Sequence, residues 1–324
     1  KAMINTVRNT VLSVLNKNNY GYLSPSDFNL FSKQAQLDIF ESYFYQYNYQ
    51  INKENVRQSG TGVANVTKSI EESIDLFSLT RGLNTTSSIA GSYFMPSEAT
   101  TGSDYYYLNK LLAYKEIITS GTTTAFDAAN NLLIDSAQAF DTLGIVSGDV
   151  VGVQTATQGV QYLTIVSVTD ATTILTSGTV LIAAGFAYSI IKAGTQQNEI
   201  EKVTHTKINM LNNSIYTSPS ATYPSYTSEE ATLQVYPNTI STAGRIIAQY
   251  YRYPKSPNWT YIELANGEPI FNQSDAQYQD FEIPLDDENN LIMKILQYAG
   301  VSIREPEVFS FASNQEGKEN QQEG

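Results

Sequence analysis

Residues 24–57 read SPSDFNLFSKQAQLDIFESYFYQYNYQINKENVR, and they predict one long helix at the centre of the chain. Ser24 has the residue type of an N-cap, and Pro25 suits the first helical position. Asp27 stands three residues after the cap, where a capping-box acid belongs. The start of this helix is therefore the best-marked boundary in the sequence.

Apolar residues of this stretch recur at spacings of three and four, which predicts a buried stripe along one side of the helix. The stripe consists of Leu37, Phe40, Phe44, Tyr47 and Ile51. A strand, suggested by the alternating tyrosines of residues 43–49, would split this set over two faces. Tyr45 and Tyr49 lie one helical turn apart and away from the stripe, so we expect them on a second face that contacts a neighbouring subunit.

The composition excludes several classes of chemistry. The 324 residues contain no cysteine and a single histidine, which excludes thiol catalysis, thiolate metal sites, disulfides and multi-histidine metal sites. Hydrophobic residues make up 41% of the chain, so a packed core is expected. Tyrosine is abundant (23 residues), which is typical of proteins with large amphipathic contact surfaces. We expect no cofactor and no catalytic residues.

The net charge of −13 argues against a general nucleic-acid binder, because such proteins need cations to neutralise phosphates. Residues 1–20 show no signal-peptide pattern, and no apolar run approaches the length of a membrane span. We therefore expect a soluble protein made in a cytoplasm, with no membrane partner.

The helices predicted from periodicity and caps are 2–17, 24–57, 65–79 and 286–299, so the chain opens with a helical hairpin or bundle. The loop Asn16–Asp27 has the spacing of a degenerate EF-hand, but a single carboxylate makes a plain turn the better interpretation. Gly60-Thr61-Gly62 lacks the lysine and the further glycine of a phosphate loop. Asp286 is expected to cap the last helix, with Asp287 and Glu288 stabilising its N-terminal end.

Residues 80–104 are rich in Ser, Thr and Gly and predict an extended connection, and 105–115 predict a strand. The composition changes at 116: no lysine or arginine occurs between Lys115 and Lys192, and short strands alternate with turns. We interpret 119–194 as an inserted small all-β barrel or sandwich. Its aspartates, Asp127, Asp135, Asp141 and Asp149, have the spacing of turn residues rather than of a metal cluster.

The flanking parts, 1–118 and 195–312, are expected to form a discontinuous α+β core. In the second part, His205 lies among β-formers and is interpreted as structural. Segments 233–236 and 245–253 predict paired strands. Arg252 and Trp259, close to several tyrosines, are candidate contact residues. They could form a stacking site for nucleic acid, but packing in internal cation–π contacts is the more common use of such residues. The polar tail 313–324 is expected to be disordered.

Several motifs resemble one protein family. Residues Gly21–Asn29 running into Lys33–Phe40 resemble the opening of neck proteins of short-tailed bacteriophages, particularly the crassviruses. Tyr251–Trp259 and Asp280–Ile283 are similar to the C-terminal half of the same group. The region 119–194, with Phe140, Gly144 and Gly148-Asp149-Val150, looks like a small β module that recurs in phage structural proteins.

This resemblance implies a non-enzymatic ring protein beneath the portal, a head-to-tail adaptor of about a dozen copies. It implies contacts with the portal and with other neck or tail rings, passage of DNA without specific binding, and a location in the virion neck after assembly in the host cytoplasm. The alternative is a phage fibre, spike or surface protein whose β module binds glycans. That alternative requires an exposed aromatic platform on 119–194.

Overall fold

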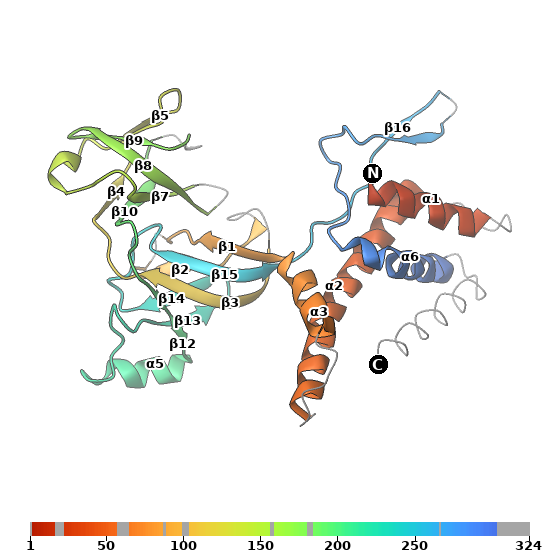
Figure 1. Cartoon of the computed structure of the whole chain (residues 1–324), viewed down its shortest axis with the longest axis horizontal. Helices are drawn as coiled ribbons and strands as arrows, with labels where there is room; N and C mark the ends of the chain where they lie inside the picture. Colours follow the sequence, from red (N-terminus) through yellow and green to blue (C-terminus); the bar gives the residue numbers. More distant parts are fainter. Residues whose placement is uncertain are drawn as a thin grey trace. The chain divides into compact units, whose positions relative to one another are not determined.

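The computed structural model describes residues 2–16, 23–56, 65–86, 89–98, 104–155, 159–179, 184–265 and 267–302. Helices and extensive antiparallel sheet are both present, which confirms the predicted α+β class. The chain forms two compact units: Lys1–Phe77 together with Tyr253–Gly324, and Ser78–Arg252 (Figure 1). The second unit is thus inserted in sequence between the two parts of the first.

The first unit is mainly helical. It contains α1 (Met3–Asn16), α2 (Pro25–Val56), α3 (Asn65–Asp75) and α6 (Glu288–Ser302), with a short hairpin of β16 (Tyr261–Glu263) and β17 (Pro269–Phe271). Helix α6 packs against both α1 and α2, and α3 packs against α2. The N-terminal bundle is therefore completed by a helix from the other end of the chain. Because a 3₁₀ turn, η2 (Leu285–Asp287), precedes α6 and has Pro284 at its N-cap position, Asp286 is not the cap we predicted.

The start of α2 is as predicted, but its buried face is not. The Ser24 hydroxyl accepts a hydrogen bond from the Asp27 backbone N–H at 3.1 Å and donates one to the Asp27 carboxylate at 2.7 Å. Of the predicted stripe only Phe40 is fully buried; the others are half-buried. The buried positions are Phe28, Ser32, Ala35, Gln36, Ile39, Phe40 and Tyr43. Because Ser32 and Gln36 in this set are polar, the spacing of apolar residues does not identify this buried face.

Polar side chains of α2 hold the returning C-terminal segment. The Gln36 amide donates to the Lys255 carbonyl at 2.8 Å and accepts from the Glu282 backbone N–H at 3.0 Å. Asn29 accepts from the Trp259 backbone N–H at 2.8 Å. A buried amide is stable only when its donor and acceptor both find partners, and Gln36 finds them on two separate stretches of backbone. These bonds fix the path of residues 255–282 along the helix.

The second unit contains two of the described sheets. Its strands are β1 (Ser78–Gly82), β2 (Ser92–Phe94), β3 (Tyr105–Tyr114), β4 (Thr119–Thr122), β5 (Ala125–Asp127), β6 (Leu132–Ile134), β7 (Val150–Gln154), β8 (Val160–Asp170), β9 (Thr173–Thr176), β10 (Ala187–Ile191), β11 (Gln197–Glu199), β12 (Glu201–Lys202), β13 (Ser225–Glu229), β14 (Thr232–Tyr236) and β15 (Ile246–Arg252). The larger sheet has the order β11-β3-β15-β1-β8-β7-β10-β4, with β9, β6 and β5 continuing from β8. The smaller sheet has the order β12-β13-β14-β2.

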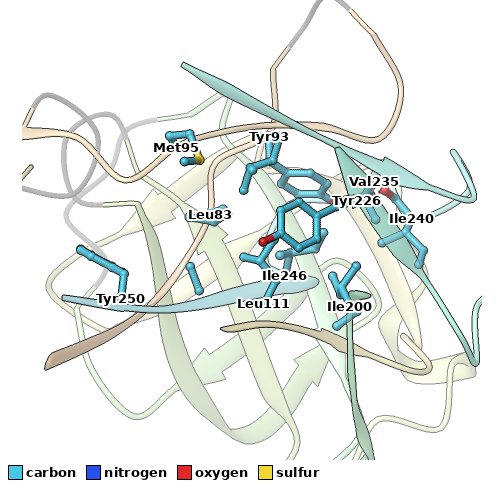
Figure 2. Close-up of a cluster of buried hydrophobic side chains, with 13 residues drawn as sticks. Leu83, Tyr93, Met95, Leu111, Ile200, Tyr226, Val235, Ile240, Ile246 and Tyr250 are labelled. Atoms are coloured by element: carbon cyan, nitrogen blue, oxygen red, sulfur yellow. Dashed lines mark hydrogen bonds between the residues drawn. The ribbon is translucent and has the colours of Figure 1, made fainter. Parts of the chain in front are cut away.

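A hydrophobic core joins the two sheets of this unit. Leu111 on β3 and Ile246 on β15 belong to the same buried cluster as Tyr93 on β2 and Val235 on β14 (Figure 2). The Tyr93 hydroxyl donates to the Thr242 carbonyl at 3.1 Å, so the buried phenol is satisfied. Burial raises the pKa of Tyr93, and the phenol therefore stays neutral. The two sheets are thus packed face to face through an apolar layer.

Residues 119–194 have a hydrophobic cluster of their own. Its members are Leu133, Phe140, Ile145, Val151, Val153, Ile165, Ile174, Tyr188 and Ile190. The region also joins the neighbouring strands: Gly82 on β1 pairs with Val160 on β8, and the Tyr162 hydroxyl donates to the Gly244 carbonyl at 2.9 Å. A Cβ on Gly82 would lie 2.5 Å from that hydroxyl oxygen, so the contact between β1 and β8 requires glycine at position 82.

The two compact units meet in sequence at Phe77/Ser78 and at Arg252/Tyr253, whereas the predicted boundaries are at 118/119 and 194/195. Strands β1–β3 and β11–β15, which we assigned to the core formed by 1–118 and 195–312, lie in one unit with 119–194. The predicted insert is a part of this unit with its own core, and its separate domain status stays a prediction.

Two predictions about the C-terminal half are wrong. Segments 233–236 and 245–253 do not pair with each other: β14 pairs with β13 and β2, and β15 pairs with β1 and β3. Residues around His205 form a helix, α5 (His205–Asn212), capped by Thr204, whose hydroxyl accepts from the Lys207 backbone N–H. The connection 80–104 also contains β2 and most of β1. Each of these elements is short, and β2, β14 and β15 pair with strands far away in sequence.

Asp149 shows the structural use of an acidic turn residue. Its buried carboxylate accepts from the backbone N–H groups of Val146 and Ala193, both at 3.0 Å, and pairs with the Lys192 ammonium at 3.2 Å. Burial alone would raise the pKa of Asp149, but the hydrogen bonds and the lysine outweigh it and lower the pKa. The carboxylate therefore stabilises the fold above its ordinary pKa, and this stabilisation is lost as the pH falls through the lower folded value.

We expect Asp149→Asn to lower the free energy of unfolding at pH 7 by about 2 kcal/mol, because an amide nitrogen would face a backbone or lysine donor. The difference from wild type should shrink as the pH falls below about 4, the ordinary pKa of an aspartate, towards the lower pKa of the folded carboxylate. Urea denaturation followed by circular dichroism between pH 7 and pH 3 measures both effects. Asp141→Asn, at an exposed position, is the control and should change stability by less than about 0.5 kcal/mol. A pH-independent difference for Asp149→Asn would contradict this account.

Candidate interaction surfaces

The described residues offer no cluster suited to a metal ion. Among them, no three His, Cys, Asp or Glu side chains come together in a way that could hold one. Asp127, Asp135 and Asp149 each accept a backbone N–H from two or three residues away in a turn, as the spacing predicted. Gly60-Thr61-Gly62 and residues 17–22 of the Asn16–Asp27 loop lie outside the described residues, as does the tail 313–324.

Trp259 is a core residue of the first unit. Its side chain is only 2% exposed, and its indole N–H donates to the Asn5 side chain at 3.1 Å. The Arg8 guanidinium carbon lies 3.8 Å from the centre of the indole ring, which is a cation–π contact. Tyr261 and Phe271 stack on the same ring system. Of the two uses that the sequence left open for Trp259, internal packing is the one observed, and the cation comes from α1 rather than from Arg252.

Arg252 and the two tyrosines of α2 are placed differently. Arg252 is the last residue of β15, pairs with Tyr105 on β3, and is half-buried. Tyr45 is 75% exposed and Tyr49 is 50% exposed, both on the side of α2 away from the buried seam. Tyr45 is the residue of this group that offers the most surface to a partner.

The hairpin β16–β17 presents an exposed apolar face. Ile262 pairs with Ile270 across the two strands, and both side chains are exposed, as is Leu264 just beyond β16. We call these three residues the hairpin face. The opposite side of the ribbon is anchored, because Tyr261 and Phe271 stack on Trp259. A two-stranded ribbon has little stability by itself, so this anchorage explains how it holds apolar side chains out in water.

A second set of exposed apolar side chains belongs to α5, which lies at the lower left of Figure 1, and to the segment after it. Its members are Met210, Ile215, Tyr216 and Tyr223, which we call the α5 surface. The helix was not predicted, because His205 lies among β-formers. Thr204 as an N-cap, with Ile208 and Leu211 three positions apart, was the signal for the helix.

In the part of the chain that the structure describes, no helix is long and apolar enough to cross a bilayer. Two of the ion pairs of the second unit involve the first turn of α5: Lys207 pairs with Glu201 at 3.2 Å, and His205 approaches Glu229 at 3.8 Å.

Comparisons with known proteins add no further assignment. No protein-family model matches the chain, and a search of curated proteins returned no match. The candidate sites therefore rest on the residues and geometry described above.

Replacing Trp259 tests whether its side chain stabilises the fold or serves only to contact a partner. We expect Trp259→Ala to lower the free energy of unfolding by about 3 to 5 kcal/mol, because a large buried ring and its contacts with Arg8 and Asn5 are lost. Tyr45→Ser, at an exposed position on α2, should change it by less than about 0.5 kcal/mol. Urea denaturation followed by far-ultraviolet circular dichroism, which reports on the helices, measures the difference. Equal effects of the two substitutions would refute the placement of Trp259 in the core.

Proposed function

We propose that this protein is a structural component of a bacteriophage neck, a ring-forming adaptor that joins the portal to the tail and continues the DNA conduit. The motif resemblance at Gly21–Phe40, Tyr251–Trp259 and Asp280–Ile283 supports this role. The first segment contacts both of the others: Asn29 binds the Trp259 backbone, and Gln36 binds the backbone of Lys255 in the second segment and of Glu282 in the third. The motifs that resemble the family therefore build one connected part of the fold.

The observation that carries the proposal is the presence of two different apolar surfaces on an acidic chain. Identical copies close a ring through a heterologous contact, in which each copy offers two unlike surfaces. The hairpin face belongs to the first unit and the α5 surface to the second, and the residues of each are exposed. A monomeric enzyme has no need of two such surfaces, which are typical of subunits that pack side by side.

The charge of the chain fits a conduit. A net charge of −13 disfavours retention of a passing DNA duplex, because each phosphate meets a surface of the same sign. In this proposal the wall facing the DNA is acidic or neutral, and a strongly basic lining would contradict it.

The glycan-binding alternative lacks the platform that it requires. The five aromatic residues of 119–194 are Phe126, Phe140, Tyr162, Phe186 and Tyr188, and each is buried or half-buried. Phe140 and Tyr188 are in the buried cluster, and Phe126 and Phe186 pack against it. Sugar recognition through stacking needs exposed rings, so we do not favour this function.

Mass photometry and negative-stain microscopy test the proposal directly. The purified protein should form rings or, when mixed with the portal of the same virion, a collar of about a dozen copies on one portal face. An adaptor that assembles only on its template would be monomeric alone and ring-forming in the mixture, so the mixture is the decisive sample. A monomer in both samples, together with a virion neck that lacks the protein, would refute the function.

Free DNA provides a second test. We expect no retention of a double-stranded fragment by the purified protein in an electrophoretic assay, because the acidic chain cannot release enough counterions from the phosphates. The assay is repeated at about 0.05 M and about 0.15 M salt, since electrostatic binding is strongest at low salt. Sequence-independent retention that weakens as salt rises would count against the conduit model.

A further inference from the structure

The α5 surface is unusual in both its exposure and its lack of charge. Ile215 is 95% exposed and Tyr216 is 99% exposed, which is close to complete exposure for large apolar side chains. Met210 and Tyr223 are also largely exposed. Residues 208–228 contain no acidic or basic side chain, although the whole chain carries a net charge of −13. An acidic protein thus presents a neutral, apolar surface at this place.

The backbone beneath these side chains is held by hydrogen bonds. The Ser218 N–H donates to the Ser214 carbonyl at 3.0 Å, and the Thr217 hydroxyl donates to the Leu211 carbonyl at 3.2 Å. Farther along, Ser220 and Tyr223 bond to each other, with the Tyr223 backbone N–H donating to the Ser220 hydroxyl at 3.2 Å. Ile215 and Tyr216 therefore project from an ordered turn, and a partner gains their burial without first ordering the segment.

We propose that the α5 surface binds a neighbouring copy of this chain. Two copies that each carry a net charge of −13 repel one another wherever their charged surfaces approach. The repulsion is smallest where the facing surface has no charge, and the apolar side chains there supply the attraction. This inference rests on the proposed function, in which copies pack side by side, and it assigns a surface to that contact.

Other occupants fit the surface less well. A nucleic acid would need cations to neutralise its phosphates, and residues 208–228 supply none. A strongly basic protein would lose the hydration of its cations against this segment without gaining a carboxylate there. The nearest ion pairs, Lys207 with Glu201 and His205 with Glu229, are already formed within the chain. A neutral surface on a second copy of the chain brings neither phosphates that need cations nor cations that would lose their hydration.

Because the chain has no cysteine, single-cysteine labelling gives a clean test. Ile215→Cys, labelled with a polarity-sensitive fluorophore, should show a blue shift as protein concentration rises and copies associate. Ile89→Cys, which replaces an exposed isoleucine elsewhere in the same unit, is the matched control and should keep a water-like emission. A blue shift at both positions, or at neither while copies associate, would overturn the assignment.

Substitutions that introduce a charge at position 215 then test whether the bound partner is an acidic copy of the chain. In sedimentation velocity, Ile215→Asp should raise the dissociation constant of the copies at least about tenfold, and Ile215→Lys should raise it less, because the neighbour is acidic. Ile89→Asp should leave the constant unchanged. Raising salt from about 0.05 M to about 0.5 M should strengthen association of the wild type by screening repulsion. The reverse order of the two charge variants, or weaker association at high salt, would overturn the proposal.

The same samples separate this inference from the proposed function. Portal-bound rings that Ile215→Asp enters as readily as wild type would overturn the inference and leave the adaptor role intact. Copies that associate through position 215 but never form a ring or collar would support the surface and contradict the adaptor role. A monomer at every protein concentration and salt, with and without portal, would overturn both.

Discussion

The buried amide of Gln36 is the contact on which the helical unit most depends. It joins α2 to the backbone at Lys255 and at Glu282, so two distant stretches are fixed by one side chain. The neighbouring polar contacts act in the same direction: the Asp280 carboxylate accepts the first backbone N–H groups of α1, at Met3 and Ile4, which also suits the helix dipole. The phenols of Tyr43 and Tyr298 donate to Asp287 and Asp38. The unit is therefore specified by satisfied buried polar groups as much as by apolar packing.

Features that depend on local chemistry could be predicted from the sequence. The cap at Ser24, the extent of α2, and the strand predicted at 105–115 follow from neighbouring residues, and they agree with the structure. The buried face of α2 could not be predicted, because two of its residues are polar: Gln36 is buried through hydrogen bonds to segments far away in sequence, and Ser32 is buried as well. Both partners of β15 and one partner of β14, namely β2, lie far away in sequence, and a short strand contains no record of such a neighbour.

The candidate surface residues also divide into those that local sequence predicts and those that depend on the tertiary fold. Exposure of Tyr45 followed from its position on the helix, since side-chain direction on a long helix is set by periodicity. Trp259 and Arg252 were candidates because of residue type alone, and the structure shows Trp259 buried, with the Arg8 guanidinium over its ring. The hairpin face and the α5 surface could not be identified earlier, because an exposed isoleucine looks the same in a sequence as a buried one. Their recognition requires knowledge of which faces the tertiary fold covers.

The order of the segments along the chain has a consequence for synthesis on the ribosome. Helices α1, α2 and α3 are translated first, but α6 and the strands around Trp259 follow only after the whole of Ser78–Arg252. The β unit can fold while the early helices still lack their packing partners. Because the hairpin face is anchored on Trp259, it can form only after the whole of Ser78–Arg252 has been translated.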